Sequence, residues 1–239
     1  YPGVAMRIGA QWVEHTAHSS RPVLDPASGQ EIGRTPIAGP EQIAAALAAA
    51  AGAFDGWRRM LPIERFRIIS RAAALLRERA AAIAATLTLE QGKPIAEALR
   101  EVTIAADIID FLAEEAKRLA ARGVPPRSPG VASQTVQRIP VGPVAAFTPW
   151  NFPANLPARK LGAALAAGCS VIIKPDEQTA ATCMAIVQCY IDAGLPAGVL
   201  NMLTGRPAEI SQALIESPVI AKVSGDKLHP TNVGRLCTK

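Results

Sequence analysis

Short, uninterrupted apolar runs in the second half of the chain alternate with segments long enough to form a helix. The runs lie in "GPVAAFTP", "CSVIIKP", "VLNMLTG" and "IAKVSG", separated by "ANLPARKLGAALAAG", "TAATCMAIVQCYIDAG" and "PAEISQALIES". Strands that are buried on both faces read as continuous apolar runs. Because strands that alternate with helices form right-handed βαβ units, the pattern predicts an α/β fold. We expect a Rossmann-like parallel sheet with helices on both faces.

The first half of the chain predicts helices instead. It opens with a hairpin-like "MRIGAQWVEH" and a turn-rich stretch, and then three segments keep a helical period: "GPEQIAAALAAAAGAFDGW", "PIERFRIISRAAALLRERAAAIAATLTLEQGK" and "PIAEALREVTIAADIIDFLAEEAKRLAARG". We expect three helices in series, the second ending near Gly92 and the third near Gly123. Residues 124–142 begin with several prolines and then alternate, which predicts an extended arm or hairpin.

Composition argues against several classes of function. Aromatic residues make up only 4% of the chain, too few for a stacking surface for nucleic acid. The net charge of +5 is compatible with an anionic partner, but the densest basic stretch, "ERFRIISRAAALLRER", has the spacing of a solvated helix face. No apolar run approaches the ~18 residues of a membrane span. We therefore expect neither nucleic acid nor a membrane among the partners.

The four cysteines have neither the paired spacing of a zinc site nor the density of a disulfide scaffold. Cys183 and Cys189 are six residues apart on a predicted helix, which places them on different sides of it. We expect no metal site and a reducing, cytoplasmic compartment.

In a doubly wound sheet the ligand lies beyond the carboxyl ends of the strands. The residues there are "TPWNFP", "KPDEQT", "TGRPAE" and "SGDKLHPTNVG", which include neither G-x-G-x-x-G nor a phosphate loop. Glu177 follows the second strand, where a carboxylate reads the ribose hydroxyls of a dinucleotide. Lys174 stands beside it, either as a cation for ribose or phosphate or as a strand-end lysine that reaches solvent. Asn151, between two prolines, is either a rigid amide donor suited to an oxyanion or an ordinary turn residue.

Three stretches together, "PWNFP", "RKLGAALAAGCSVIIKPDEQT" and "EQGKP", resemble the aldehyde dehydrogenase superfamily, closest in pattern to its succinate semialdehyde dehydrogenases. The spacing of 23 residues from Asn151 to Lys174 also fits. The similarity begins at about Ile8 and covers only the amino-terminal, cofactor-binding half of the family. It implies a helical part of the cofactor domain at 1–123, an oligomerisation arm at 124–142 and a truncated dinucleotide-binding core at 143–239, with no catalytic domain.

The resemblance implies NAD(P)-dependent oxidation of an aldehyde to an acid through a cysteine thiohemiacetal, in a homo-oligomer. Asn151 would donate to the oxyanion, and Lys174 and Glu177 would hold the adenosine ribose, with Glu177 favouring NAD over NADP. Gly205 would let the backbone pass close to the adenine. The residues that the resemblance places at the cofactor are Thr148, Pro149, Trp150, Asn151, Lys174, Pro175, Asp176, Glu177 and Gly205.

The predicted substrate class depends on Arg159, which stands eight residues after Asn151. Members of the family that act on carboxylate-bearing semialdehydes have an arginine there, and a guanidinium binds a carboxylate in a bidentate pair. The alternative is an arginine on the surface of a helix. We expect a semialdehyde such as succinate semialdehyde.

The chain departs from the family in two places. The motifs of the catalytic cysteine and the general-base glutamate, similar to "GQxC" and "ELGGK", do not occur before Lys239, so we expect this chain alone to be inactive. His229 and Pro230 also replace the glycine and serine of the pyrophosphate-binding turn, which puts pyrophosphate binding in question. The alternative function is an inactive fragment that binds a nucleotide or pairs with other subunits.

Overall fold

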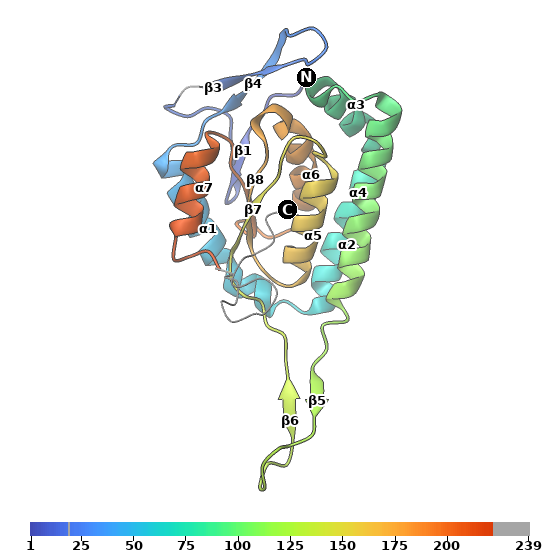
Figure 1. The fold of residues 1–239 in the computed structure, drawn as a ribbon, viewed down its shortest axis with the longest axis vertical. Helices are drawn as coiled ribbons and strands as arrows, with labels where there is room; N and C mark the ends of the chain where they lie inside the picture. Colours follow the sequence, from blue (N-terminus) through green and yellow to red (C-terminus); the bar gives the residue numbers. More distant parts are fainter. Residues whose placement is uncertain (19, 222–239) are drawn as a thin grey trace, which may run out of the picture.

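A five-stranded sheet lies at the centre of the computed structural model, which describes residues 1–18 and 20–221 (Figure 1). Its strand order is β2-β1-β9-β8-β7, with β7, β8 and β9 parallel and β1 and β2 antiparallel. The strands are β1 (Met6–Ile8), β2 (Gln11–Val13), β7 (Val144–Phe147), β8 (Val171–Lys174) and β9 (Leu200–Met202). The α/β class is confirmed, and so is the hairpin at the start of the chain. Strand β1 of that hairpin pairs with β9 in antiparallel orientation, which makes the sheet mixed. The hairpin also covers an edge of the sheet that would otherwise expose unpaired backbone groups.

Helices cover both faces of the sheet, as predicted. Helices α1 and α7 pack on one face, and α5 and α6 pack on the other beneath an outer layer of α2, α3 and α4 (Figure 1). The central strand β8 serves both faces: Val171 and Ile173 join the core with α5 and α6, whereas Ile172 joins the core with α1 and α7. The helices are α1 (Pro40–Arg59), α2 (Pro62–Glu78), α3 (Ala80–Gln91), α4 (Ile95–Ala116), α5 (Asn155–Ala166), α6 (Ala180–Asp192) and α7 (Pro207–Glu216).

Four helices, not three, precede the arm. The second predicted helix is divided at Arg79 into α2 and α3, and both packed segments contact α4 and α6. Neither glycine nor proline marks the break, so the tertiary packing decides it. The end near Gly92 is confirmed, since Gly92 adopts φ +86° after α3. The predicted helix end near Gly123 is wrong. Helix α4 ends at Ala116, because the next residues contribute no buried side chain.

Two small hairpins lie outside the central sheet (Figure 1). The turn-rich segment forms β3 (Ser20–Leu24) and β4 (Glu31–Pro36) near the carboxyl edge of the sheet. The alternating segment at 124–142 lies in a hairpin of β5 (Arg122–Val124) and β6 (Gln134–Val136), which projects away from the body. The predicted hairpin is therefore present. The fourth apolar run, "IAKVSG", extends outside the described residues.

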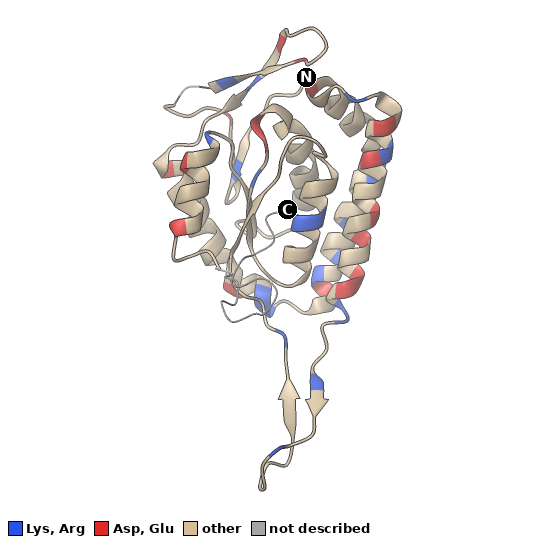
Figure 2. Cartoon of the chain, viewed as in Figure 1, with Lys and Arg blue, Asp and Glu red and all other residues tan. Residues whose placement is uncertain are grey.

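Charged side chains of both signs follow the outer helices, whereas the sheet is largely uncharged (Figure 2). Over the described ranges, no helix is long and apolar enough to cross a membrane. Within the same ranges, no cluster of potential metal ligands occurs.

Candidate functional site

Three loops meet at the carboxyl edge of the parallel strands. Phe147 and Lys174 are paired at the ends of β7 and β8, and the amide of Thr148 donates to the carbonyl of Lys174 at 3.2 Å. On the other side, the amide of Leu203 donates to the carbonyl of Ile173 at 2.9 Å. The parallel register therefore brings the loops that carry Thr148, Lys174 and Gly205 to one edge of the sheet.

Lys174 and Glu177 form a buried ion pair at this edge. Each residue is only 5% exposed, and Lys174 Nζ lies 2.8 Å from Glu177 Oε2. Arg21, from β3, reaches the other carboxylate oxygen at 3.2 Å. The loop around Glu177 is fixed as well, because Thr35 donates to its carbonyl at 3.1 Å and Asp176 accepts from the amide of Gln178 at 3.0 Å.

This donor set fits the ribose of a dinucleotide. A buried carboxylate is costly unless it is paired, and Lys174 and Arg21 supply the pairing. A carboxylate has about four acceptor positions on two oxygens, so Glu177 retains acceptors for a vicinal diol. Gly205 adopts φ +138°, and a Cβ there would lie 2.9 Å from the amide nitrogen of Ala38. Close packing against the segment before α1 therefore already requires glycine at this position.

The "PWNFP" turn lies between β7 and α5. Pro149, Trp150, Asn151 and Phe152 are exposed, whereas Pro153 is buried. Within the part of the chain that the structure describes, the side chain of Asn151 makes no hydrogen bond. Asn151 is therefore exposed in the middle of the turn, whereas the turn becomes buried at Pro153.

The beginning of α5 is held by a carboxylate from another helix. Glu101 of α4, only 4% exposed, accepts hydrogen bonds from the amides of Ala154 at 2.9 Å and Asn155 at 3.1 Å. Its second oxygen forms an ion pair with Lys93, whose ammonium lies 4.8 Å from the centre of the Phe152 ring. These contacts connect α4 to the turn that carries Asn151.

Helix α6 begins in a similar way. Glu90, 3% exposed at the end of α3, accepts hydrogen bonds from the amides of Ala181 at 3.1 Å and Thr182 at 2.9 Å and from the Tyr1 hydroxyl at 2.7 Å. Burial raises the pKa of the Glu90 carboxyl from 4.5 to about 7, because removal from water disfavours the charged form more than the hydrogen bonds favour it. The N-termini of α5 and α6 are thus occupied by carboxyl groups of the protein itself.

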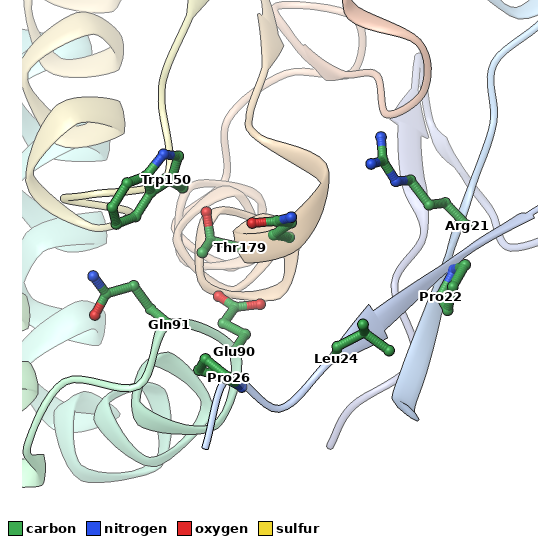
Figure 3. Close-up of a pocket in the computed structure, with 9 residues that line it drawn as sticks. Arg21, Pro22, Leu24, Pro26, Glu90, Gln91, Trp150 and Thr179 are labelled. Carbon is green, nitrogen blue, oxygen red and sulfur yellow. The ribbon is translucent and has the colours of Figure 1, made fainter. Parts of the chain in front are cut away.

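A cavity of about 410 Å³ lies beside Glu90 (Figure 3). The β3 hairpin forms one wall with Arg21, Pro22 and Leu24, and Trp150 lies on the opposite side. Trp150 is 54% exposed, so its ring has free surface for a flat ligand.

Arg159 lies on α5, away from the Lys174 and Glu177 pair. It is exposed, and the structure shows no ion pair for it with any described residue. It lines a separate pocket with apolar side chains of α4 and with Asp107, whose carboxylate forms an ion pair with Arg77. The apolar residues of that pocket are Ile104, Ile108, Phe111 and Leu112. A cation beside apolar side chains suits a ligand with an anionic end.

The described cysteines are structural. Cys169, Cys183 and Cys189 are buried free thiols. Burial raises the pKa of Cys189 to about 11 and that of Cys183 further, which keeps both as unreactive thiols. Cys237 and the predicted departures at His229 and Pro230 lie outside the described residues.

Comparison with known proteins agrees with this arrangement. A model of the aldehyde dehydrogenase family matches residues 12–225. The chain belongs to the aldehyde dehydrogenase family. Members of this family are oxidoreductases that act on aldehydes with NAD or NADP.

Two curated relatives illustrate the similarity. A 4-(hydroxymethyl)benzenesulfonate dehydrogenase from Comamonas testosteroni is 46% identical over 217 residues, which cover 91% of this chain and 45% of the relative. The succinate-semialdehyde dehydrogenase [NADP(+)] from Escherichia coli K12 is 37% identical over 217 residues, which again cover 91% of this chain and 45% of the relative. Among solved structures, a succinate-semialdehyde dehydrogenase from Burkholderia pseudomallei has a TM-score of 0.88 at 38% identity, covering 91% of this chain and 45% of that one. The chain spans about half the length of these relatives.

Four charged residues around this candidate site had no role predicted from the sequence: Arg21, Glu90, Lys93 and Glu101. A signal for Glu101 was present, because it shares a helical face with Ala98, Val102 and Ala105, and an isolated charge on an apolar face needs a partner. Arg21 offered no comparable signal, since it reaches the site only through the folding of the β3 hairpin.

Proposed function

We propose that the chain is the cofactor-binding half of an NAD-dependent aldehyde dehydrogenase whose substrate is a carboxylate-bearing semialdehyde such as succinate semialdehyde. The observation that carries the proposal is the buried Lys174 and Glu177 pair at the same sheet edge as the Asn151 turn, in a chain of the aldehyde dehydrogenase family. The nucleotide removes hydride from the substrate when it is bound. The residues of this chain bind that nucleotide and stabilise the negative charge that develops on the aldehyde oxygen.

The cofactor roles follow from the positions of the residues. Lys174 and Glu177 bind the adenosine ribose, and the carboxylate disfavours a 2′-phosphate because like charges repel, so NAD is the proposed nucleotide, with NADP as the alternative. The flanking residues of the two loops line the remainder of the nucleotide. These residues are Thr148, Pro149, Trp150, Pro175, Asp176 and, on the third loop, Gly205.

Asn151 is the proposed oxyanion donor. Its amide is exposed and uncommitted within the described ranges, and a preorganised donor of this kind typically contributes ~10²–10³ in rate. The nucleophilic cysteine and general base are not among the described residues, so we propose that this chain alone does not turn over.

Arg159 is the proposed contact for the anionic end of the substrate. Its guanidinium forms no ion pair with a described residue and adjoins the apolar pocket on α4, which suits an aldehyde with a carbon chain and a terminal carboxylate. The relative from Comamonas testosteroni is named for a sulfonate, another anionic group. That name supports the anionic class.

The projecting hairpin at 124–142 is the proposed oligomerisation arm of a dimer or tetramer, because its side chains are largely exposed and make few contacts with the body. The buried free thiols support a reducing, cytoplasmic compartment.

Two measurements test these proposals. Calorimetric titration of the chain with NAD should give a binding signal that Glu177→Ala weakens, and absence of binding in both proteins would contradict the cofactor role. In the natural protein, Arg159→Ala should raise KM for succinate semialdehyde by at least ~10-fold, since a charge-assisted hydrogen bond contributes about 1.5–3 kcal/mol. KM for an uncharged aldehyde should change little. Equal effects on both substrates would refute the carboxylate role.

A further inference from the structure

Helix α5 begins without a capping side chain of its own. Its N-cap residue is Ala154, which cannot accept a hydrogen bond through its side chain. The first amides of a helix need acceptors from elsewhere, and Glu101 supplies one oxygen to two of them. Because that carboxylate belongs to α4, 53 residues earlier in the chain, the start of α5 is fixed by tertiary structure.

Lys93 completes the arrangement. Its ammonium pairs with the second oxygen of Glu101 and lies over the ring of Phe152. Lysine 93 is therefore in contact with both the carboxylate and the residue directly after Asn151. Its side chain is 12% exposed, and that of Glu101 is 3% exposed, so little water competes for this pair.

Two residues shortly after Asn151 are thus in contact with side chains from outside the turn. The ammonium of Lys93 lies over the ring of Phe152, and Glu101 accepts a hydrogen bond from the amide of Ala154. An amide that donates to a developing oxyanion needs placement within about 0.5 Å, and an error of 1 Å can cost ~10²-fold in rate. Among the described residues, no hydrogen bond holds the Asn151 side chain itself, so its placement depends on the backbone of the turn.

Charge balance supports the same assignment. An unpaired carboxylate near the Asn151 turn would oppose the negative charge that develops on the substrate oxygen. The ion pair with Lys93 neutralises Glu101 while both of its hydrogen bonds to α5 remain. The pair can therefore hold the turn without this electrostatic cost.

We propose that Glu101, together with Lys93, is a positioning residue that fixes the Asn151 amide for oxyanion binding. Neither residue touches the substrate; both act through the backbone of α5 and the ring of Phe152. The effect on catalysis rests on the proposed role of Asn151. The effect of Glu101 and Lys93 on the order of the turn and of the start of α5 is independent of that role.

Amide hydrogen exchange on the chain itself tests the structural part. Glu101→Ala should speed exchange at the amides of Ala154 and Asn155 by at least ~10-fold, because both lose their acceptor. The amides of Ala181 and Thr182 should keep their protection. The matched control is Glu90→Ala, which should give the reverse pattern. Unchanged exchange at α5, or a uniform increase over the whole chain, would overturn the proposal.

Milder variants keep the test valid if Glu101→Ala does not fold. Glu101→Gln retains an acceptor oxygen and removes the charge, and Lys93→Met retains the carboxylate cap but removes the ion pair and the contact with the Phe152 ring. Lys93→Met should increase exchange at the amide of Leu156, which donates to the carbonyl of Phe152, more than at residues 181–182. Equal increases in both segments would count against positioning by Lys93.

Kinetics of the natural protein separate this inference from the proposed function. Glu101→Gln and Lys93→Met should each lower kcat, by up to ~10²-fold, while KM and the affinity for NAD stay within about twofold. Asn151→Ala should lower kcat as well. If Asn151→Ala leaves kcat unchanged, the proposed oxyanion role fails. If Asn151→Ala lowers kcat and neither Glu101→Ala nor Lys93→Met does, the positioning role fails alone.

Discussion

The buried carboxyl of Glu90 should make the stability of the chain depend on pH in an unusual direction. Its pKa is raised from 4.5 to about 7 by burial, and one pKa unit corresponds to about 1.4 kcal/mol. An unfolded chain releases this proton near pH 4.5, whereas the native protein keeps it to about pH 7. Between these values the native state binds more protons, so stability is highest below pH 4.5 and falls as the pH rises toward 7.

Integration between pH 5 and pH 8 gives a loss of roughly 2–3 kcal/mol for this single group. The neighbouring groups contribute little over this range. Burial and the nearby Glu90 raise the pKa of both Tyr1 and Cys183, so these two stay neutral. Arg21, which lines the same cavity, is paired with Glu177.

Urea denaturation at both pH values measures the effect, with Glu90→Gln as the comparison. Ala181 and Thr182 donate to different oxygens of Glu90, so glutamine keeps an acceptor for only one of the two amides, and it does not titrate. The lost hydrogen bond lowers stability equally at both pH values, so it cancels when the two pH values are compared. From pH 5 to pH 8, wild type should lose roughly 2–3 kcal/mol of unfolding free energy relative to Glu90→Gln. Parallel pH dependences for the two proteins would refute the reasoning.

Two further substitutions test the packing. Gly198→Ala should destabilise the chain by about 1–3 kcal/mol, because Gly198 has φ +82° and a Cβ there would lie 2.8 Å from the carbonyl oxygen of Ala49; an unchanged midpoint in urea denaturation would contradict this strain. Leu161→Ala should cost about 2–5 kcal/mol, because Leu161 is fully buried between α5 and its neighbours, and a loss below ~1 kcal/mol in the same assay would show that the site collapses around the smaller side chain.

The sequence predicts the sheet better than it predicts the helices around it. The run "VIIK" could only be a strand buried on both faces, and the structure places Ile172 toward one helical layer and Ile173 toward the other. The break at Arg79 could not be predicted, since it depends on how α2 and α3 each pack against α4. Local sequence signals do not contain that information.

The same distinction applies to the candidate site. Lys174 and Glu177 could be placed because they follow a strand whose end defines the ligand-binding edge. Glu101 acts across 53 residues of sequence, and Arg21 reaches Glu177 from the β3 hairpin. Such long-range partners become visible only when the fold is known.

The short motif "EQGKP" connects both halves of the site. Its Glu90 accepts from the first amides of α6, and its Lys93 pairs with the Glu101 that accepts from the first amides of α5. Free helix N-termini at the carboxyl edge of a sheet are ordinary phosphate sites, but here the carboxyl groups of Glu101 and Glu90 occupy the N-termini of α5 and α6. A phosphate at either end would meet a carboxylate instead of open amides. The first two βα turns therefore hold the segments that carry Asn151 and Glu177, and we expect the N-termini of α5 and α6 to bind no phosphate.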